Sequence, residues 1–370
     1  MSDAIFWLLL VAAVLAAQAA DAPATEDAET GRRAGPTGRL AQAIRRAMSP
    51  PAPPPPAPWD LGGRAQPAPV PGAGGAAVAR IILTAGAGLM VLVGLLTLAG
   101  AQGGGSSGSS RNHDLVGGAL QLAAGLASLA LFYGGAERVP GFRRLRAGAP
   151  VSWLAILLFF ESLAVNLAPA SGQETVTSTV QSSGGSGTSA ESLMIGAVPF
   201  LVIGVAAVGP GVRRGLRQSA ERLGLWPLRL PWWVIGLIVG LVLVPVGDWV
   251  AGLLTNLTSA HCLAQQVRVE QAITGTGRTA LEQIGVAVAA GVCEETLFRG
   301  ALQPRFGIVL SSALWASYHL QYTCNGLPST SNLYILMLGF VLGGLRRAGG
   351  LWPAIIAHTV YDGTILLGLL

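Results

Sequence analysis

CEETLFRG, at residues 293–300, places two adjacent carboxylic acids and one guanidinium inside an apolar segment of the chain. The charged side chains are Glu294, Glu295 and Arg299. One ionised side chain at the centre of a membrane-spanning helix costs about 2.5–3.5 kcal/mol on insertion scales, unless it pairs with another group or faces a wet cavity. Adjacent charges in one apolar helix therefore indicate an active site within the membrane.

The composition of the whole chain is typical of an integral membrane protein. Of its 370 residues, 51% are hydrophobic and 11% are charged, whereas about 25% are charged in an average soluble domain. We therefore predict an all-α fold, a polytopic helical bundle with about ten transmembrane helices. The candidate spans are 4–20, 79–101, 115–134, 151–168, 192–212, 231–254, 280–304, 306–322, 331–345 and 351–369.

The distribution of arginine predicts the topology. Arginine-rich loops precede the second span and follow the third, fifth, seventh and ninth, whereas the other loops contain only Arg111, Arg268 and Arg278. By the positive-inside rule the arginine-rich loops are cytoplasmic and both termini are external. We therefore relate the net charge of +5 to the membrane and expect no nucleic-acid partner. The absence of lysine and the abundance of alanine and glycine suggest a GC-rich bacterial genome. We therefore expect a multi-pass protein of the bacterial inner (plasma) membrane.

Three further regions are predicted before the core that contains the charged motif. Residues 1–20 are expected to be an uncleaved signal-anchor helix, because cleavage after Ala19 would export the arginines that follow. Residues 21–78 form a predicted cytoplasmic linker rich in proline, alanine and arginine, which cannot build a core. Residues 79–190 supply additional transmembrane helices, and residues 191–370 form the core that contains the charged motif.

Two cysteines lie in predicted external loops, and the third lies inside a span. A disulfide between Cys262 and Cys324 is possible in an oxidising compartment, and two unrelated thiols are the alternative. Such a bridge would link the loop before the CEETLFRG helix to the loop that follows His319.

Two later motifs carry the remaining candidate groups. WASYH occupies residues 315–319 and HTVYD occupies residues 358–362. At a rise of about 1.5 Å per residue, Glu294, His319, His358 and Asp362 lie at comparable depths, roughly 10–20 Å from the cytoplasmic helix ends. We therefore expect these side chains to meet in one layer of the membrane.

Helical spacing predicts different roles for the two glutamates. Glu295 and Arg299 are four residues apart, so they share a helix face and can pair. Glu294 is turned by about 100° and points elsewhere. His358 and Asp362 are also four residues apart, so the carboxylate can orient the imidazole or bind jointly with it.

These groups favour hydrolysis by an activated water. A carboxylate can act as the general base for water, and an imidazole can position that water or donate to an oxyanion. Zinc-dependent proteolysis is an alternative, with Glu294, His319, His358 and Asp362 as the ligands, although the chain lacks an HExxH helix.

A non-enzymatic alternative comes from acids elsewhere in the membrane region. A transporter or a scaffold with the same fold could use Glu161 and Asp248, which lie in or near predicted spans. An isolated Glu161 could also simply bond to a neighbouring helix.

In their order, the three motifs resemble the CPBP family of intramembrane proteases, which includes the type II CAAX prenyl endopeptidases and bacteriocin-processing (ABI) membrane proteins. The family pattern EExxxR, FxxxH and HxxxN/D is represented by CEETLFRG, WASYH and HTVYD, and the resemblance covers about residues 195–370. It implies a type II CAAX protease-like core without a cofactor, acting in the bilayer on a membrane-embedded or lipidated peptide or protein. Prenylated peptides are one precedent for that substrate.

The resemblance also implies a role for each residue. Glu294 would activate water with the help of His319, His358 and Asp362 would bind the oxyanion or the water, and Glu295 with Arg299 would support the site. Two positions depart from the pattern, because Trp315 replaces phenylalanine and Asp362 replaces the commoner asparagine. An aspartate donates a hydrogen bond only when protonated, so Asp362 could instead orient His358.

Overall fold

A computed structural model describes residues 11–18, 73–103, 108–145, 149–167, 189–210, 214–255, 258–264, 266–267, 278–319 and 330–369. These residues are helical apart from turns and one isolated bridge between Pro210 and Arg214. The main helices are α3 (Ala73–Gly103), α4 (Gly108–Gly134), α5 (Pro150–Leu167), α7 (Ala190–Val208), α8 (Leu216–Leu223), α9 (Leu230–Thr255), α11 (Ala280–Glu295), the π-helix η5 (Thr296–Leu302), α12 (Gln303–Ser317), α13 (Thr330–Gly349) and α14 (Leu351–Leu366). The all-helical class is therefore confirmed for the described part of the chain.

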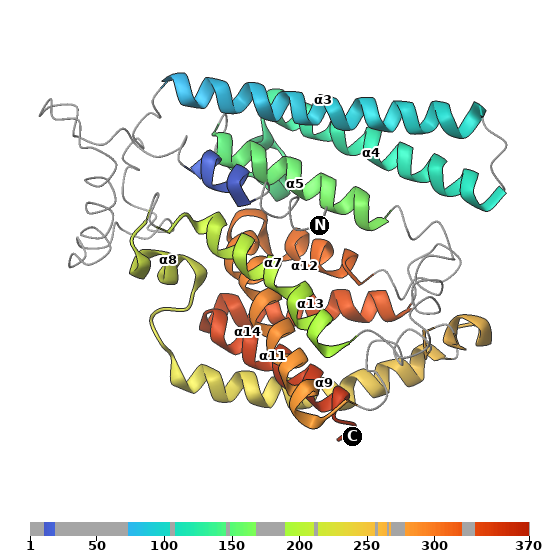
Figure 1. The fold of residues 1–370 in the computed structure, drawn as a ribbon. Coiled ribbons are helices and arrows are strands. Elements are labelled where there is room, and N and C mark those ends of the chain that lie inside the picture. The colour runs from blue at the N-terminus through green and yellow to red at the C-terminus, as the bar shows by residue number, and fades with distance from the viewer. Residues whose placement is uncertain are drawn as a thin grey trace, which may run out of the picture.

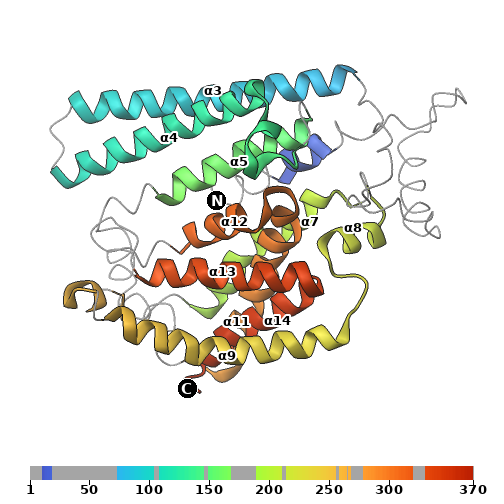
Figure 2. The ribbon, with the colours of Figure 1, turned by 180° about the vertical axis from the view of Figure 1, so that it is seen from behind.

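The helices form two groups that lie against each other (Figure 1). Helices α3, α4 and α5 lie together on one side, and α7, α9 and α11–α14 make the C-terminal core on the other, as the view from behind also shows (Figure 2). Aromatic side chains join the groups. The ring centroids of Phe142 and Phe159 lie 5.6 Å and 5.1 Å from the ring centroid of Phe306 in α12. Asn166 at the end of α5 also donates a hydrogen bond to Ser317, with an N–O distance of 3.0 Å.

Glycines bring three of the core helices unusually close together. A Cβ atom at Gly236 of α9 would lie 2.6 Å from the main-chain oxygen of Pro353 in α14. A Cβ atom at Gly291 of α11 would lie 2.2 Å from Oγ1 of Thr359, also in α14. Only glycine allows such backbone approach, so α14 is fixed between α9 and α11.

Five described helices are long and apolar enough to cross a membrane. They cover 77–101, 114–134, 150–167, 190–208 and 230–253, and they correspond to the second through sixth predicted spans. The total of about ten spans stays a prediction. Most of the predicted signal anchor, most of the linker at 21–78 and Cys324 lie outside the described residues. Within the described residues, α3 begins at Ala73, before the expected end of the linker.

Several helix ends differ from the predicted spans for identifiable reasons. The helix expected at 192–212 ends at Val208, where Gly209 adopts a left-handed conformation with φ of 70°. The span expected at 306–322 was wrong at its C-terminal end, because α12 ends at Ser317. The amide of His319 bonds to the carbonyl of Ala316, three residues back, which tightens the last turn. His319 therefore follows the helix instead of lying within it.

Candidate active site

The charged motif lies where α11 passes into the π-helix η5. Helix α11 starts with a capping box, in which Thr279 accepts from the amide of Glu282 and Glu282 accepts from the amide of Thr279. It continues to Glu295, and the π-helix Thr296–Leu302 follows directly. Single π-helical turns are frequent at functional sites, because they change the register of the side chains that follow. The periodicity of the sequence predicted one continuous α-helix here.

Glu295 is the centre of a buried ion-pair network. Its Oε1 atom accepts from Nη1 of Arg299 at 2.8 Å and lies 2.9 Å from Nδ1 of His358. The side chains of Glu295 and Arg299 are both 0% exposed. The predicted pair of Glu295 and Arg299 is therefore present, and it extends to His358 on α14.

His358 has a carboxylate at each ring nitrogen. Its Nδ1 faces Glu295, and its Nε2 lies 3.3 Å from Oδ2 of Asp362. Only the imidazolium form donates from both nitrogens, so this arrangement suits a positively charged ring. The network thus holds two cationic groups, Arg299 and His358, against two carboxylates.

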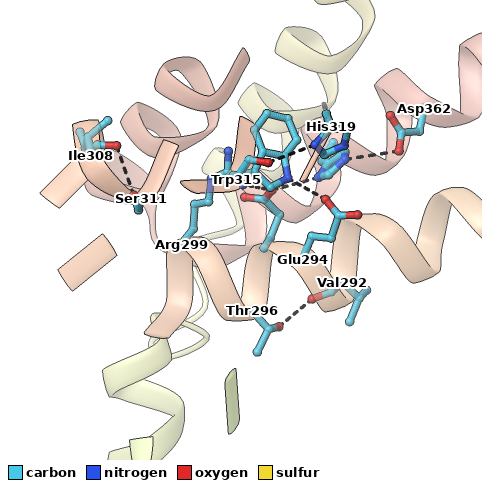
Figure 3. Close-up of polar contacts among 11 residues, drawn as sticks. Val292, Glu294, Thr296, Arg299, Ile308, Ser311, Trp315, His319 and Asp362 are labelled. Carbon is cyan, nitrogen blue, oxygen red and sulfur yellow. Dashed lines mark hydrogen bonds and ion pairs between the residues drawn. The ribbon is translucent and has the colours of Figure 1, made fainter. Parts of the chain in front are cut away.

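Glu294 has a different environment from Glu295. Its Oε2 atom accepts a hydrogen bond from Nε1 of Trp315 at 2.6 Å, and no ion pair joins it to a described residue (Figure 3). The Trp315 ring in turn lies under the guanidinium of Arg299, with 4.4 Å between the guanidinium carbon and the ring centroid. Trp315 therefore separates the two glutamate environments and holds the Glu294 carboxylate in place.

His319 is positioned by main-chain contacts on both sides. Its Nδ1 lies 3.1 Å from the carbonyl oxygen of Trp315, and its own carbonyl accepts from the side-chain amide of Asn332 in α13 at 2.8 Å. A carbonyl oxygen only accepts, so Nδ1 carries the proton. In the neutral ring, Nε2 is then left as a proton acceptor.

The four predicted catalytic residues line one cavity of about 750 Å³: Glu294, His319, His358 and Asp362. Its other walls come largely from apolar residues of α7, α9 and α13, including Phe200, Leu243 and Leu338. The expectation that these side chains meet is confirmed, while their roles in catalysis stay predictions. A carboxylate and an imidazole facing a mostly apolar cavity are suited to acid–base chemistry on a bound apolar ligand.

The residues do not fit a metal centre as they lie. Among the described side chains, no group of three or more His, Cys, Asp or Glu residues could hold a metal ion. Both nitrogens of His358 face carboxylates, so neither has a lone pair directed at the cavity.

Three features of the cavity were not assigned to it from the sequence. Trp315 replaces the phenylalanine of the family pattern, and its indole N–H, which phenylalanine lacks, is the donor to Glu294. Asp248, the acid that a transporter could use, lines the same cavity as Glu294. Tyr334 of α13 also lines it and donates to the carbonyl of Leu243 at 3.0 Å. Of these three residues, only Trp315 lies in one of the motifs that predict the site, WASYH at 315–319.

The other expected acid, Glu161, lies outside this cavity. Its Oε2 atom accepts from Nε2 of Gln121 in α4 at 2.8 Å. The simple interpretation, a bond to a neighbouring helix, is therefore confirmed. Of the cysteines, Cys293 is a buried free thiol and Cys262 is disulfide-bonded.

Comparison with known families covers the same region. Residues 276–364 match the family model described as Type II CAAX prenyl endopeptidase Rce1-like. These residues form a Rce1-like domain. The family expected from the three motifs is thereby confirmed for this region. No curated protein and no solved structure matches the chain.

The Rce1-like domain contains the complete charged network. It runs from before α11 into α14 and includes all six residues predicted for the site: Glu294, Glu295, Arg299, His319, His358 and Asp362. Helices α7 and α9, which supply other walls of the cavity, precede the matched residues. Together with the apolar helices, the family points to a multi-pass membrane protein and implies a protease of the CAAX endopeptidase kind.

Proposed function

We propose that the protein is an intramembrane endopeptidase in which Glu294 activates a water molecule. The observation that carries this proposal is the difference in environment between the two adjacent glutamates, Glu294 and Glu295. Glu295 is fully buried and paired with Arg299 and His358, whereas Glu294 faces the cavity and, among the described residues, accepts a hydrogen bond from the neutral indole of Trp315. A general base needs access to the substrate and to water, and of these two glutamates Glu294 is the one that faces the cavity.

The reaction begins with proton transfer from water to the Glu294 carboxylate. The water oxygen forms a bond to the carbon of the scissile carbonyl, and the carbonyl oxygen becomes an oxyanion. The proton then passes to the nitrogen of the peptide as the carbon–nitrogen bond breaks, which releases a new amine and a new carboxyl terminus. No external oxidant, reductant or cofactor takes part in these steps.

His319 and His358 have separate tasks in this scheme. The Nε2 atom of neutral His319 accepts a hydrogen bond from the water. This bond orients a lone pair of the water oxygen toward the carbonyl carbon. The positive charge of His358 stabilises the oxyanion, and its Nε2–H becomes available once the 3.3 Å contact with Asp362 opens. Glu295 and Arg299 position His358 and do not touch the substrate.

The surroundings favour a substrate that comes from the membrane. The cavity is lined mainly by apolar side chains, and two of the helices that bound it, α7 and α9, meet the length and hydropathy of membrane spans. We infer a membrane-embedded or lipidated peptide or protein as the substrate, and an inner-membrane location with the arginine-rich loops in the cytoplasm. A prenylated C-terminal peptide is one member of this class.

The decisive experiment compares new peptide termini made by the wild-type protein and by Glu294→Gln. Both are purified and incubated with a library of membrane peptides that includes farnesylated members, and the products are identified by mass spectrometry. Cuts made only by the wild type establish proteolysis and give its specificity. Glu161→Gln is the matched control, because it also removes a carboxylate among apolar helices but lies outside the cavity. Loss of function in Glu161→Gln but not in Glu294→Gln would instead favour a transporter.

A further inference from the structure

Asp248 of α9 adds a third carboxylate to the cavity that contains Glu294 and Asp362. It lies within the apolar span 230–253 and is exposed. It forms no hydrogen bond or ion pair with any residue that the structure describes. An ionised acid within a span needs a partner or a wet cavity. The carboxylate of Asp248 is therefore available to a ligand in the cavity.

The described lining of the cavity has an excess of negative charge. It contains three carboxylates and neither arginine nor lysine. The buried network contributes no net charge, because each of its two cations lies against a carboxylate. Asp248 and Glu294 thus face the cavity without an ion-pair partner among the described residues. Opposite charges attract strongly where little water separates them, so the cavity favours a substrate with a positive charge.

Two tyrosines share the cavity with Asp248. Tyr334 of α13 and Tyr361 of α14 both line it, with 6.4 Å between their ring centroids. Tyr334 packs against α9 next to Asp248, since its hydroxyl donates to the carbonyl of Leu243 at 3.0 Å and would lie 2.6 Å from a Cβ added at Gly247. The charge of Asp248 acts on this hydroxyl. Aromatic rings attract ammonium and guanidinium groups, so the carboxylate and the tyrosines together suit a basic side chain.

The packing of α9 on α14 follows one register. A Cβ atom at Gly236 would lie 2.6 Å from the main-chain oxygen of Pro353, and one at Gly240 would lie 2.8 Å from that of Ala357. The contact thus advances by the same number of residues on both helices. The two helices therefore run side by side in the same direction.

This register gives the distance between Asp248 and the reacting groups. It places Asp248 level with Ile365, which also lines the cavity. Ile365 follows His358 by two turns of α14, which is about 10 Å along the helix axis at a rise of about 1.5 Å per residue. An extended peptide spans about 3.3 Å per residue. A charge beside Asp248 is therefore about three residues from a carbonyl group at His358.

We propose that Asp248 selects substrates with a lysine or arginine side chain about three residues from the scissile bond. The carboxylate pairs with the ammonium or guanidinium group, and the rings of Tyr334 and Tyr361 contact the same side chain. This inference rests on the proposed function, because it describes the substrate of the same cavity. Asp248 precedes residues 276–364, so the selection depends on α9 and not on the Rce1-like domain alone.

The first test measures binding without hydrolysis, in the full-length Glu294→Gln protein. The probes are fluorescent transmembrane peptides of leucine and alanine with blocked ends, which carry one central arginine or its neutral isostere citrulline. We expect the arginine peptide to bind about fivefold more tightly, the upper value for a partly solvated ion pair. Addition of Asp248→Asn should remove this preference, and Asp248→Lys should reverse it in favour of a glutamate peptide. Equal binding of the arginine and citrulline peptides to Glu294→Gln would overturn the proposal, and that result needs no substitution at Asp248.

The second test measures cleavage by the otherwise wild-type protein, with the arginine or citrulline moved one position at a time along the peptides. We expect the cleaved bond to move with the arginine at a separation of about three residues, and Asp248→Asn should abolish this dependence. If no peptide is cleaved, the proposed function fails while the binding test still decides the role of Asp248.

Glu191→Gln is the matched control in both tests. Glu191 lies in the first turn of α7 beside Ser192, which lines the cavity, but Glu191 is exposed and outside the lining. Its removal deletes one negative charge near the same cavity, and the preference for arginine should stay within about twofold of the parent protein. Equal losses of preference in Glu191→Gln and Asp248→Asn would overturn a specific role for Asp248 and leave only the overall charge of the protein.

Discussion

Glu294 and Glu295 are adjacent in the chain, yet their carboxylates belong to separate environments divided by the ring of Trp315. The indole N–H of Trp315 lies 2.6 Å from Glu294, while Arg299, the partner of Glu295, lies over the face of the same ring at 4.4 Å. One side of the ring therefore faces a buried ion-pair network, and its edge faces the cavity. We therefore expect Glu294 to serve catalysis and Glu295 to serve stability, and a substitution at each residue tests its role separately.

Glu294→Gln should abolish peptide hydrolysis while leaving the fold intact. The amide cannot accept a proton from water, and loss of a general base costs roughly 10²–10⁴-fold in rate. Its oxygen still accepts from Trp315, so the unfolding temperature should change little. Peptide cleavage and thermal unfolding in the same detergent measure the two effects. Full activity in Glu294→Gln would assign the base to another residue.

Glu295→Gln should show the opposite balance. The substitution leaves Arg299 fully buried without its carboxylate, and removal of one partner of a buried ion pair costs about 3–5 kcal/mol. We expect a clear fall in the unfolding temperature, together with reduced activity because His358 loses its positioning partner. A Glu295→Gln protein as stable as the wild type, but inactive, would place Glu295 in the reaction itself.

Trp315→Phe tests how much the indole donor contributes. Phenylalanine keeps an aromatic ring under Arg299 but removes the hydrogen bond to Glu294, and bonds to charged groups contribute about 1.5–3 kcal/mol. We expect a folded protein with activity reduced by no more than about 100-fold, since the base itself is retained.

Trp315→Ala should unfold at a much lower temperature, because truncation of a buried aromatic costs about 3–5 kcal/mol. Trp249→Phe, on an exposed side chain of α9, is the control and should change neither property.

The ion pair and the meeting of the motifs were predictable because they depend on short-range helix geometry. A spacing of four residues places Glu295 beside Arg299 and His358 beside Asp362, whatever the surrounding fold. The shared cavity followed from depth along the helices, which needs only a constant rise per residue. The separate environments of Glu294 and Glu295 agree with the rotation of about 100° between consecutive residues.

Other features depend on contacts that local patterns do not encode. The π-helix keeps the same apolar residues as an α-helix would, so periodicity predicted one continuous span. The bond from His358 to Glu295 joins residues far apart in the chain and depends on the close approach of α11 and α14 at Gly291. The early end of α12 follows from two amides that bond three residues back, at Tyr318 and His319. None of these contacts has a signature in the residue order.

Chelation separates the proposed glutamate mechanism from the zinc alternative. Activity of the purified protein should survive prolonged dialysis against EDTA and 1,10-phenanthroline, because the proposed steps use only water and side chains of the protein. A known zinc protease treated in the same way provides the control for effective metal removal. Loss of activity that returns on addition of zinc would establish the metal-dependent reaction and give the four residues of the cavity the role of ligands.

Gly236→Ala should disturb the contact between α9 and α14 and, through it, the cavity. The added methyl group would lie 2.6 Å from the carbonyl oxygen and 2.8 Å from the Cα atom of Pro353, so the backbone of α14 must shift. Such overpacking costs about 1–3 kcal/mol, and the shift reaches His358 in the next turns of α14. We expect a lower unfolding temperature and slower cleavage.

Gly252→Ala is the control on the same helix, because no atom lies within 4 Å of its added Cβ. An alanine there should be neutral or slightly stabilising, since alanine favours a helix by up to about 1 kcal/mol over glycine. Equal behaviour of the two variants would show that α9 does not pack on α14 in the membrane as it does here.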